Sequence, residues 1–345
     1  MSTTSTTPPT DGTALTRKDF ASDQEVRWCP GCGDYAILKA VQSIMPELGI
    51  PREKIVFVSG IGCSSRFPYY MNTYGFHTIH GRAAAVATGL KLARPDMQVW
   101  VVTGDGDGLS IGGNHLIHAL RRNTDVKILL FDNRIYGLTK GQFSPTSRLG
   151  AKTRSTPFGS VDSPFNPVSL ALGAEATFVA RSVAIFPHHL KAVLHRAASH
   201  RGSCLVQIFQ NCNVFNDGAF DHFTDKTVRD DNTVVMEHAK PLIYGKHRDR
   251  GIRLKGRDLE AVRFEPDNPP EDLLVHHEEE QDATIAYILS RMRLPEFPVP
   301  IGIFRDVKRP SFSDMVREQL VKARERSGEP DLQKLLEGPD PWEVH

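Results

Sequence analysis

Acidic side chains and glycines alternate in residues 103–108, TGDGDG. The segment follows an apolar run and precedes a helical pattern, which is where phosphate groups bind at helix N-termini. It is neither a dinucleotide fingerprint nor a P-loop, because the glycine spacing is wrong and no Gly-Lys-Ser/Thr follows. Two aspartates would repel a bare diphosphate. The pattern therefore favours a divalent cation between carboxylate and phosphate, and Mg²⁺ is the oxygen-seeking ion of this kind.

A second oxygen ligand for this cation is expected from the next strand, which runs into residues 132–137, DNRIYG. Asp105 and Asn133 are 133 − 105 = 28 residues apart. That distance fits one helix plus one strand, so both residues should reach the same edge of a parallel sheet. A plain strand–helix turn explains GDG alone equally well. GDG with a spaced Asn predicts a site for Mg²⁺ and a diphosphate.

The five cysteines are the second group of residues that could do chemistry. Cys29 and Cys32 form a C-x-x-C, while Cys63 and Cys212 each follow a predicted strand. A lone C-x-x-C is also typical of a redox pair or half a zinc site, but the second C-x-x-C of a zinc ribbon is missing. Four thiolates at one sheet edge could hold Zn²⁺ or an iron–sulfur cluster. Cys204 lies inside an apolar run and is predicted to be a buried thiol.

The elements that must position these residues alternate along the chain. Short apolar runs predict strands at 54–60, 97–103, 126–133 and 201–211. Apolar residues at helical spacing predict helices at 33–49, 81–95 and 112–123. Strands separated by such helices predict an α/β fold, a parallel sheet with helices on both faces. Ligands of such sheets bind at the carboxyl ends of the strands.

Composition limits the possible functions. Among 345 residues, 42 Lys and Arg balance 41 Asp and Glu, which gives no reason to expect nucleic-acid binding. No apolar stretch approaches the roughly 18 residues that a membrane span needs. The N-terminus lacks the features of a secretory signal, so we expect a cytoplasmic protein.

Three regions are predicted. Residues 1–19 form a polar, disordered arm, and residues 20–230 form the domain that binds the cofactor and the cluster. Residues 231–345 form an irregular C-terminal extension, charge-dense and punctuated by proline, that contacts a partner.

Six blocks in order resemble the β subunit of 2-oxoacid:ferredoxin oxidoreductases, of the 2-oxoglutarate type. They are WCPGCGDY, GIGCSSR, HGRAAAVATG, GDGDGLSIGGNHLIHALRRN, DNRIYGLTKGQFSPTS and CNVFNDG, and the likeness spans about residues 25–220. The resemblance implies the thiamine diphosphate-binding fold, thiamine diphosphate with Mg²⁺, and one 4Fe–4S cluster. Asp132 departs from the pattern, since many members have Asn there.

The resemblance also implies individual roles. The cluster ligands would be Cys29, Cys32, Cys63 and Cys212. The Mg²⁺ ligands would be Asp105, Asn133 and the carbonyl of Ile135. The contacts to thiamine diphosphate would be Ile61, Gly62, Cys63, Ser64, Gly106, Asp107, Gly137 and Leu138.

The implied reaction is oxidative decarboxylation of a 2-oxoacid to its acyl-CoA and CO₂, with electrons passing through the cluster to ferredoxin. Lys140 would select a dicarboxylate such as 2-oxoglutarate, unless it is an ordinary loop lysine. Alternatives are a pyruvate or broad-specificity enzyme of the same kind, a non-oxidative thiamine diphosphate decarboxylase or carboligase, and a zinc-stabilised scaffold.

A catalytic carboxylate for the cofactor is missing from the matched blocks. Thiamine enzymes need one against the aminopyrimidine ring, and the few glutamates of the matched region all lie outside the blocks: Glu25, Glu47, Glu53 and Glu175. In the resembled family the α subunit supplies this glutamate. The chain is therefore expected to be active only with an α subunit, in an α2β2 heterotetramer.

Overall fold

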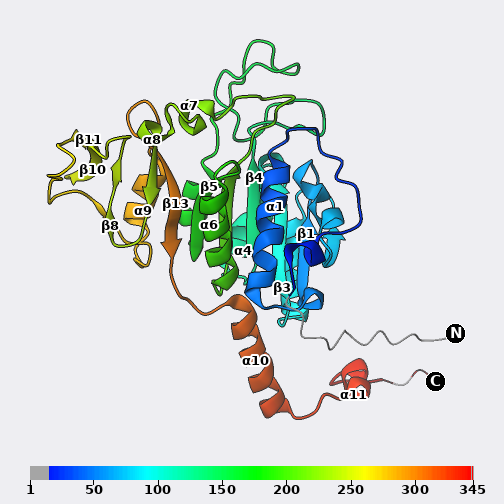
Figure 1. Ribbon diagram of the computed structural model, residues 1–345. Coiled ribbons are helices and arrows are strands. Elements are labelled where there is room, and N and C mark those ends of the chain that lie inside the picture. Colours follow the sequence, from blue (N-terminus) through cyan, green and yellow to red (C-terminus); the bar gives the residue numbers. More distant parts are fainter. Residues whose placement is uncertain (1–14, 343, 345) are drawn as a thin grey trace.

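The computed structural model describes residues 15–342 and 344, and its centre is an eight-stranded sheet (Figure 1). The strands are β1 (Ile55–Ser59), β2 (Tyr74–His77), β3 (Gln98–Gly104), β4 (Lys127–Asp132), β5 (Phe178–Val183), β6 (Cys204–Phe209), β7 (Thr233–Met236) and β13 (Val299–Asp306). Their order is β2-β1-β3-β4-β6-β5-β13-β7. Only the pairing of β13 with β5 is antiparallel. The predicted α/β fold with a mostly parallel sheet is confirmed.

Helices cover both faces of this sheet. One face carries α1 (Asp34–Ile44) and α6 (Pro187–Ser199). The other face carries α2 (Ala83–Ala93), α4 (Gly113–Arg121), α5 (Pro167–Gly173) and α9 (Thr284–Ser290). Nearly every residue of β1, β3, β4 and β6 is buried. Because successive strand residues point to opposite faces, both faces of these central strands are covered by helices.

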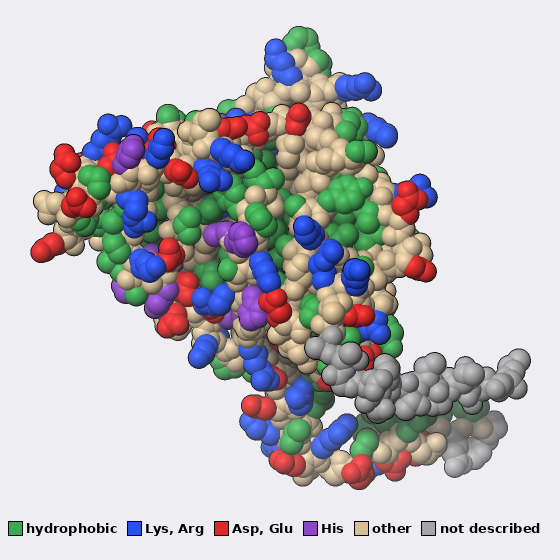
Figure 2. Space-filling view, viewed as in Figure 1, with side chains coloured by type: hydrophobic (Ala, Val, Ile, Leu, Met, Phe, Trp, Pro, Cys, Tyr) green, Lys and Arg blue, Asp and Glu red, His purple; other side chains and the backbone are tan. Residues whose placement is uncertain are grey.

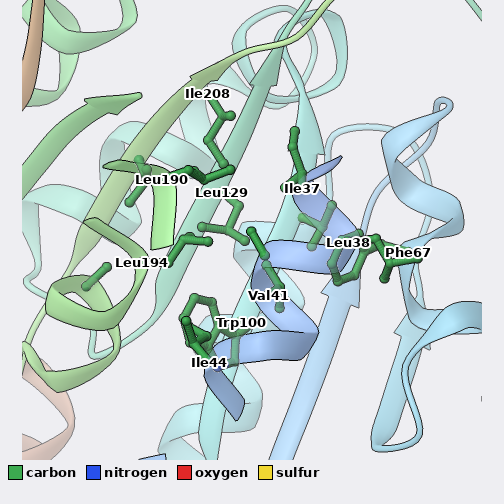
Figure 3. Close-up of a cluster of buried hydrophobic side chains, with 14 of the residues drawn as sticks. Ile37, Leu38, Val41, Ile44, Phe67, Trp100, Leu129, Leu190, Leu194 and Ile208 are labelled. Atoms are coloured by element: carbon green, nitrogen blue, oxygen red, sulfur yellow. The ribbon is translucent and has the colours of Figure 1, made fainter. Parts of the chain in front are cut away.

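A cluster of buried hydrophobic side chains joins α1 to α6 and to the sheet (Figure 3). Ile37, Val41 and Ile44 recur at helical spacing and form one stripe of α1. This stripe packs against α6 and the sheet, and the labelled partners are Leu190, Leu194, Trp100, Leu129 and Ile208. Each such buried side chain contributes about 1.5–3 kcal/mol relative to an exposed one.

Short elements connect the main ones. The helical turns are η1 (Arg17–Phe20), η2 (Met45–Leu48), η3 (Arg52–Lys54), η4 (Ser64–Tyr70), α3 (Asp105–Leu109), α7 (Asp221–Thr224) and α8 (Arg229–Asn232). Residues 1–14 of the predicted disordered arm, 1–19, lie outside the described residues. Beyond them, η1 is a 3-10 helix that buries Phe20 rather than an unstructured segment.

The part of the chain after residue 230 returns to the main sheet, because β7 and β13 are strands of it. The other elements are β8 (Lys240–Pro241), β9 (Ile243–Tyr244), β10 (Arg250–Lys255), β11 (Asp258–Arg263), β12 (Val275–His276), α10 (Phe312–Ser327) and α11 (Leu332–Glu337). Ser311 caps α10 by accepting a hydrogen bond from the Asp314 N–H, and α10 extends away from the body (Figure 1). The division at residue 230 thus does not coincide with a break in the sheet, and the partner-contacting role of 231–345 stays a prediction.

In the part of the chain that the structure describes, no helix combines the length and the apolar character needed to cross a membrane.

A buried ion-pair cluster lies at the amino end of β4. The carboxylate of Asp125 is 2.6 Å from Lys127 Nζ and 2.9 Å from Lys91 Nζ, and both lysines are buried. Burial on its own raises the pKa of Asp125, but the charges of Lys127 and Lys91 outweigh it and hold this pKa at about 2. Two buried ammonium groups therefore share one carboxylate.

Asp125→Asn should lower the free energy of unfolding by about 3–5 kcal/mol, because it leaves buried charges without their partner. Urea unfolding at neutral pH measures this loss, and Asp267→Asn on an exposed loop is the matched control. The unfolded carboxyl titrates near about pH 4. Since the folded pKa is lower, the stabilisation is complete above that pH and disappears as the pH falls toward 2. An Asp125→Asn loss no larger than that of Asp267→Asn would contradict this account.

Candidate functional site

A cavity of about 480 Å³ opens at the carboxyl ends of β1, β3 and β4. This volume is in the range of small-molecule sites. Every residue that the sequence implied for Mg²⁺ or thiamine diphosphate lines it: Ile61, Gly62, Cys63, Ser64, Asp105, Gly106, Asp107, Asn133, Ile135, Gly137 and Leu138. The topology thus brings these residues together, while their individual roles stay predictions.

Asp105 follows β3 and is almost fully buried. Its Oδ2 accepts hydrogen bonds from Ser144 Oγ and Thr146 Oγ1, each at 2.5 Å. Burial, together with the charge of neighbouring Asp132, raises the pKa of Asp105 to about 7. No lysine or arginine pairs with this carboxylate among the described residues, so a cation in the cavity would stabilise its charged form.

Asn133 and Ile135 provide further oxygen atoms at the same cavity. The Asn133 Oδ1 accepts a hydrogen bond from the Ile135 N–H at 3.1 Å, which fixes the orientation of the amide. An amide oxygen has a second lone pair available for a ligand. A carboxylate, an amide oxygen and a backbone carbonyl are the donors that Mg²⁺ prefers, so the residues present fit this ion.

Asp107 has a different surrounding from Asp105. Its carboxylate accepts hydrogen bonds from Ile61 N (3.0 Å), Gly81 N (2.7 Å), His80 Nδ1 (2.7 Å) and Thr103 Oγ1 (2.6 Å). A Cβ on Gly60 would lie 1.9 Å from its Oδ2, so only glycine fits there. The predicted contact of Asp107 with the cofactor remains untested, and its carboxylate binds donors of the protein.

His80 and Tyr136 are among the lining residues that were not singled out from the sequence. Asp107 accepts a hydrogen bond from His80 Nδ1, which leaves the other ring nitrogen, Nε2, available to a ligand. The Tyr136 hydroxyl donates to the Gly106 carbonyl at 3.0 Å, and a Cβ on Gly106 would lie 2.2 Å from its ring. Both residues belong to blocks of the resemblance, His80 to HGRA and Tyr136 to DNRIYG, but the spacing of residues within these blocks does not show that the two side chains line a cavity.

The hydroxyl of Ser64 indicates whether a ligand with oxygen atoms, such as a phosphate, suits this cavity. This hydroxyl is buried beside the cavity and has no hydrogen-bond partner among the described residues. An unpaired buried hydroxyl costs free energy, and a ligand oxygen would satisfy it.

The four candidate cluster cysteines lie in loops near one another. A Cβ on Gly137 would be 3.5 Å from Cys63 Sγ and 3.6 Å from Cys212 Sγ. Burial, then the charge of Asp34, raises the pKa of Cys63 to about 11, and Cys212 and Cys29 add to this. Burial also raises the pKa of Cys32, with smaller contributions from Asp34, Cys212 and Cys63.

The side chains of these cysteines are not arranged around a common point as metal ligands would be. Across residues 15–342 and 344, no group of three or more His, Cys, Asp or Glu side chains is arranged to hold a metal ion. Cys204 lies fully buried in β6, as the sequence predicted, and its thiol donates to the Ala197 carbonyl at 3.4 Å.

Lys140 and the glutamates lie outside the cavity lining. Lys140 is exposed with a φ of +80°, and its neighbours Thr139 and Gln142 line the cavity. The lining contains no glutamate; its acidic residues are Asp34, Asp105 and Asp107. The source of the carboxylate expected opposite the aminopyrimidine ring therefore stays a prediction.

Comparisons with known proteins agree with this geometry. Residues 60–208 match the family described as "Thiamine pyrophosphate enzyme, C-terminal TPP binding domain". The chain is 55% identical over 339 residues to "2-oxoglutarate oxidoreductase subunit KorB" of Mycobacterium tuberculosis, covering 97% of this chain and 90% of that one. It is 47% identical to "2-oxoacid:ferredoxin oxidoreductase 1, subunit beta" of Aeropyrum pernix, over 60% of this chain and 64% of the relative.

A solved structure is similar over nearly the whole chain. It is "2-oxoglutarate:ferredoxin oxidoreductase from Magnetococcus marinus with 2-oxoglutarate, coenzyme A and succinyl-CoA bound". The TM-score is 0.74 at 36% identity, and the match covers 95% of this chain and 97% of that chain. At 95% of this chain, the likeness includes strands and helices after residue 230.

The different surroundings of the two aspartates predict opposite responses to Asp→Asn in the chain free of cofactor and Mg²⁺. Asp107→Asn places an NH₂ against N–H and O–H donors and should destabilise by about 3 kcal/mol or more. Asp105→Asn keeps an acceptor for both hydroxyls and removes a buried charge, so its effect should stay within about 1 kcal/mol or be stabilising. Urea unfolding in a chelator compares the two. The account fails if Asp105→Asn costs more than Asp107→Asn.

Proposed function

The chain belongs to the KorB family of 2-oxoglutarate oxidoreductase β subunits, and we propose that it serves as this subunit in a cytoplasmic 2-oxoglutarate:ferredoxin oxidoreductase. The reaction is oxidative decarboxylation of 2-oxoglutarate to succinyl-CoA and CO₂, with electrons passing to ferredoxin. The observation that carries the proposal is the cavity at the ends of β1, β3 and β4, because it is lined by every residue implied for the cofactor and Mg²⁺.

Residues of this chain would hold the diphosphate end of the cofactor. Asp105, Asn133 and the Ile135 carbonyl provide oxygens for Mg²⁺, which removes the repulsion between the buried carboxylate and the phosphates. The Ser64 hydroxyl is free to donate to a ligand oxygen. When bound, thiamine diphosphate supplies the electron sink for loss of CO₂ from a 2-oxoacid.

The loop cysteines would hold a 4Fe–4S cluster beside this site. Cys63 itself lines the cavity, and Cys212 lies near it across Gly137. The absence of a Cβ at Gly137 leaves room next to both sulfurs. A cluster bound by Cys29, Cys32, Cys63 and Cys212 would supply a one-electron acceptor within the same sheet edge.

An α subunit would close the cavity in an α2β2 heterotetramer. Ile61 and Leu138 are large apolar side chains of the lining that are nearly half exposed. The loop 148–165 projects beyond the same edge at the top of Figure 1, and Figure 2 shows hydrophobic and basic side chains at its tip. Phe158 on this loop is 99% exposed and Val161 is 88% exposed. Apolar groups exposed to this extent are typical of an interaction surface.

The experiment is to co-express the chain with its α subunit, load cofactor and cluster under anaerobic conditions, and follow ferredoxin reduction. Reduction should require both 2-oxoglutarate and coenzyme A. The chain alone should be inactive, because no glutamate lines its cavity. Release of CO₂ without an electron acceptor would instead indicate a non-oxidative decarboxylase. Equal rates with pyruvate would indicate a broad-specificity enzyme.

Lys140→Met should raise the KM for 2-oxoglutarate far more than the KM for pyruvate. A charge-assisted hydrogen bond to a carboxylate is worth about 1.5–3 kcal/mol, or roughly 10- to 150-fold in specificity. The matched control is Lys152→Met on the neighbouring exposed loop, which should leave the ratio unchanged. Equal losses on both substrates would mean that Lys140 has no part in selecting the dicarboxylate.

Single Cys→Ser variants test the cluster ligands. Cys212→Ser and Cys29→Ser should lose bound iron and the visible absorption of the cluster. Cys204→Ser is the control, because this thiol is buried inside β6 and away from the loops. Iron lost in Cys204→Ser but retained in Cys212→Ser would reverse the assignment.

A further inference from the structure

A second cavity, of about 820 Å³, lies at the same edge of the sheet near the ends of β5 and β6 and the start of β13. It shares no lining residue with the cofactor cavity. Residues 131–135 separate the two: Asn133 and Ile135 line the first cavity, and Asp132 and Arg134 line the second. Successive side chains of this segment reach alternate cavities where the chain leaves β4 and turns, with Arg134 in the left-handed region at a φ of +59°.

The lining of the second cavity is strongly basic. It includes five arginines, at positions 134, 148, 181, 291 and 293, and His222. Its only carboxylate is Asp132, whose oxygens accept hydrogen bonds from Thr146 Oγ1 (2.9 Å) and Gln207 Nε2 (2.6 Å). The arginines therefore far outnumber the negative charges available to them within the cavity.

Arg181 is buried and Arg134 is partly buried, whereas the other three arginines are exposed. Arg181 is 4% exposed, donates to Gln207 Oε1 at 2.8 Å, and lies over the rings of Phe209 and Phe304. Burial lowers its pKa to about 10; the charge of Asp132 opposes this, and the charge of Arg134 acts in the same direction as burial.

The Arg134 guanidinium lies over Phe209 and over Phe220, with its carbon 4.7 Å from the Phe220 centroid. It makes no hydrogen bond to any described residue. Burial lowers its pKa and the charge of Arg148 adds to this, while the charges of Asp132 and Asp105 act in the opposite direction. Like charges held together and partly desolvated are unfavourable unless an anion joins them.

We propose that this second cavity binds a phosphorylated small molecule, with its phosphate groups on Arg134, Arg148 and Arg291. Planar guanidinium groups bind phosphate oxygens in pairs, which suits them to this ligand. Phe165, Phe223 and Leu294 give the cavity an apolar wall for the rest of the molecule. The volume is in the range of small-molecule sites. The site is additional to the proposed thiamine site and does not depend on it.

The test is calorimetric titration of the full chain with inorganic pyrophosphate and with ADP, in a chelator. Without Mg²⁺ the carboxylate of Asp105 repels a diphosphate from the first cavity, so binding there is suppressed. We expect one saturable site, with ADP binding at least as tightly as pyrophosphate because of the apolar wall. Asp105→Asn removes that repulsion without changing a lining residue of the second cavity, so a further site that appears only in this variant is the first cavity, while the affinity of the original site should not change.

Arg134→Gln and Arg148→Gln should each weaken pyrophosphate binding by about tenfold or more. Arg148 is on an exposed loop, so its variant remains informative if Arg134→Gln does not fold. Arg257→Gln, on the exposed turn between β10 and β11, makes the same change in net charge and should bind as the wild type does.

Three results would overturn the proposal. One is the absence of saturable binding at millimolar pyrophosphate. Another is an equal effect of Arg148→Gln and Arg257→Gln, which would show only a general charge effect. The third is loss of the site when the α subunit is bound, because that would mean that carboxylates of the partner fill the cavity.

Discussion

The carboxylate of Asp107 joins three segments that are far apart in the sequence. It accepts hydrogen bonds from Ile61 after β1, from His80 and Gly81 before α2, and from Thr103 at the end of β3. A buried carboxylate is costly unless its oxygens are satisfied, and these four donors satisfy them. The same contacts fix the positions of the loops that form one side of the cofactor cavity. The shape of the cavity is therefore set by the protein before any ligand binds.

Asp105, two residues away, lines the same cavity in a different environment. Within residues 15–342 its side-chain donors are the hydroxyls of Ser144 and Thr146, and burial next to Asp132 raises its pKa to about 7. The two aspartates of GDGDG therefore have different roles. Asp107 holds the loops together, and Asp105 presents a charge that Mg²⁺ would balance. Their equivalent places in the motif hide this difference, because it depends on which donors surround each side chain.

Much of the sheet could be predicted because β1, β3, β4 and β6 are buried on both faces and read as continuous apolar runs. β5 was missed since Arg181 interrupts its run, and only the structure shows that this guanidinium lies over Phe209 and Phe304. β13 was taken for an irregular segment because it contains Pro300. It joins the sheet antiparallel to β5, with a change of register between Ile303 and Arg305.

The same contrast holds for the two cavities. The first follows from the spacing of Asp105 and Asn133, because parallel strands must end at one edge. His80 and Tyr136 could not be identified in this way, since nothing in the local sequence shows that they line the cavity. The second cavity has no local pattern at all, because its arginines are spread from Arg134 to Arg293. They lie close together because β5 and β13 are neighbouring strands of the sheet.

The central claim is that Asp105 binds the metal that joins this chain to the diphosphate of its cofactor. Electron–nuclear double resonance tests it on the complex with the α subunit, loaded with thiamine diphosphate and with Mn²⁺ in place of Mg²⁺. The account predicts hyperfine coupling between Mn²⁺ and the phosphorus nuclei of the cofactor, and loss of this coupled signal in Asp105→Ala. A coupled signal that persists unchanged in Asp105→Ala, or protein-bound Mn²⁺ without phosphorus coupling, would contradict it.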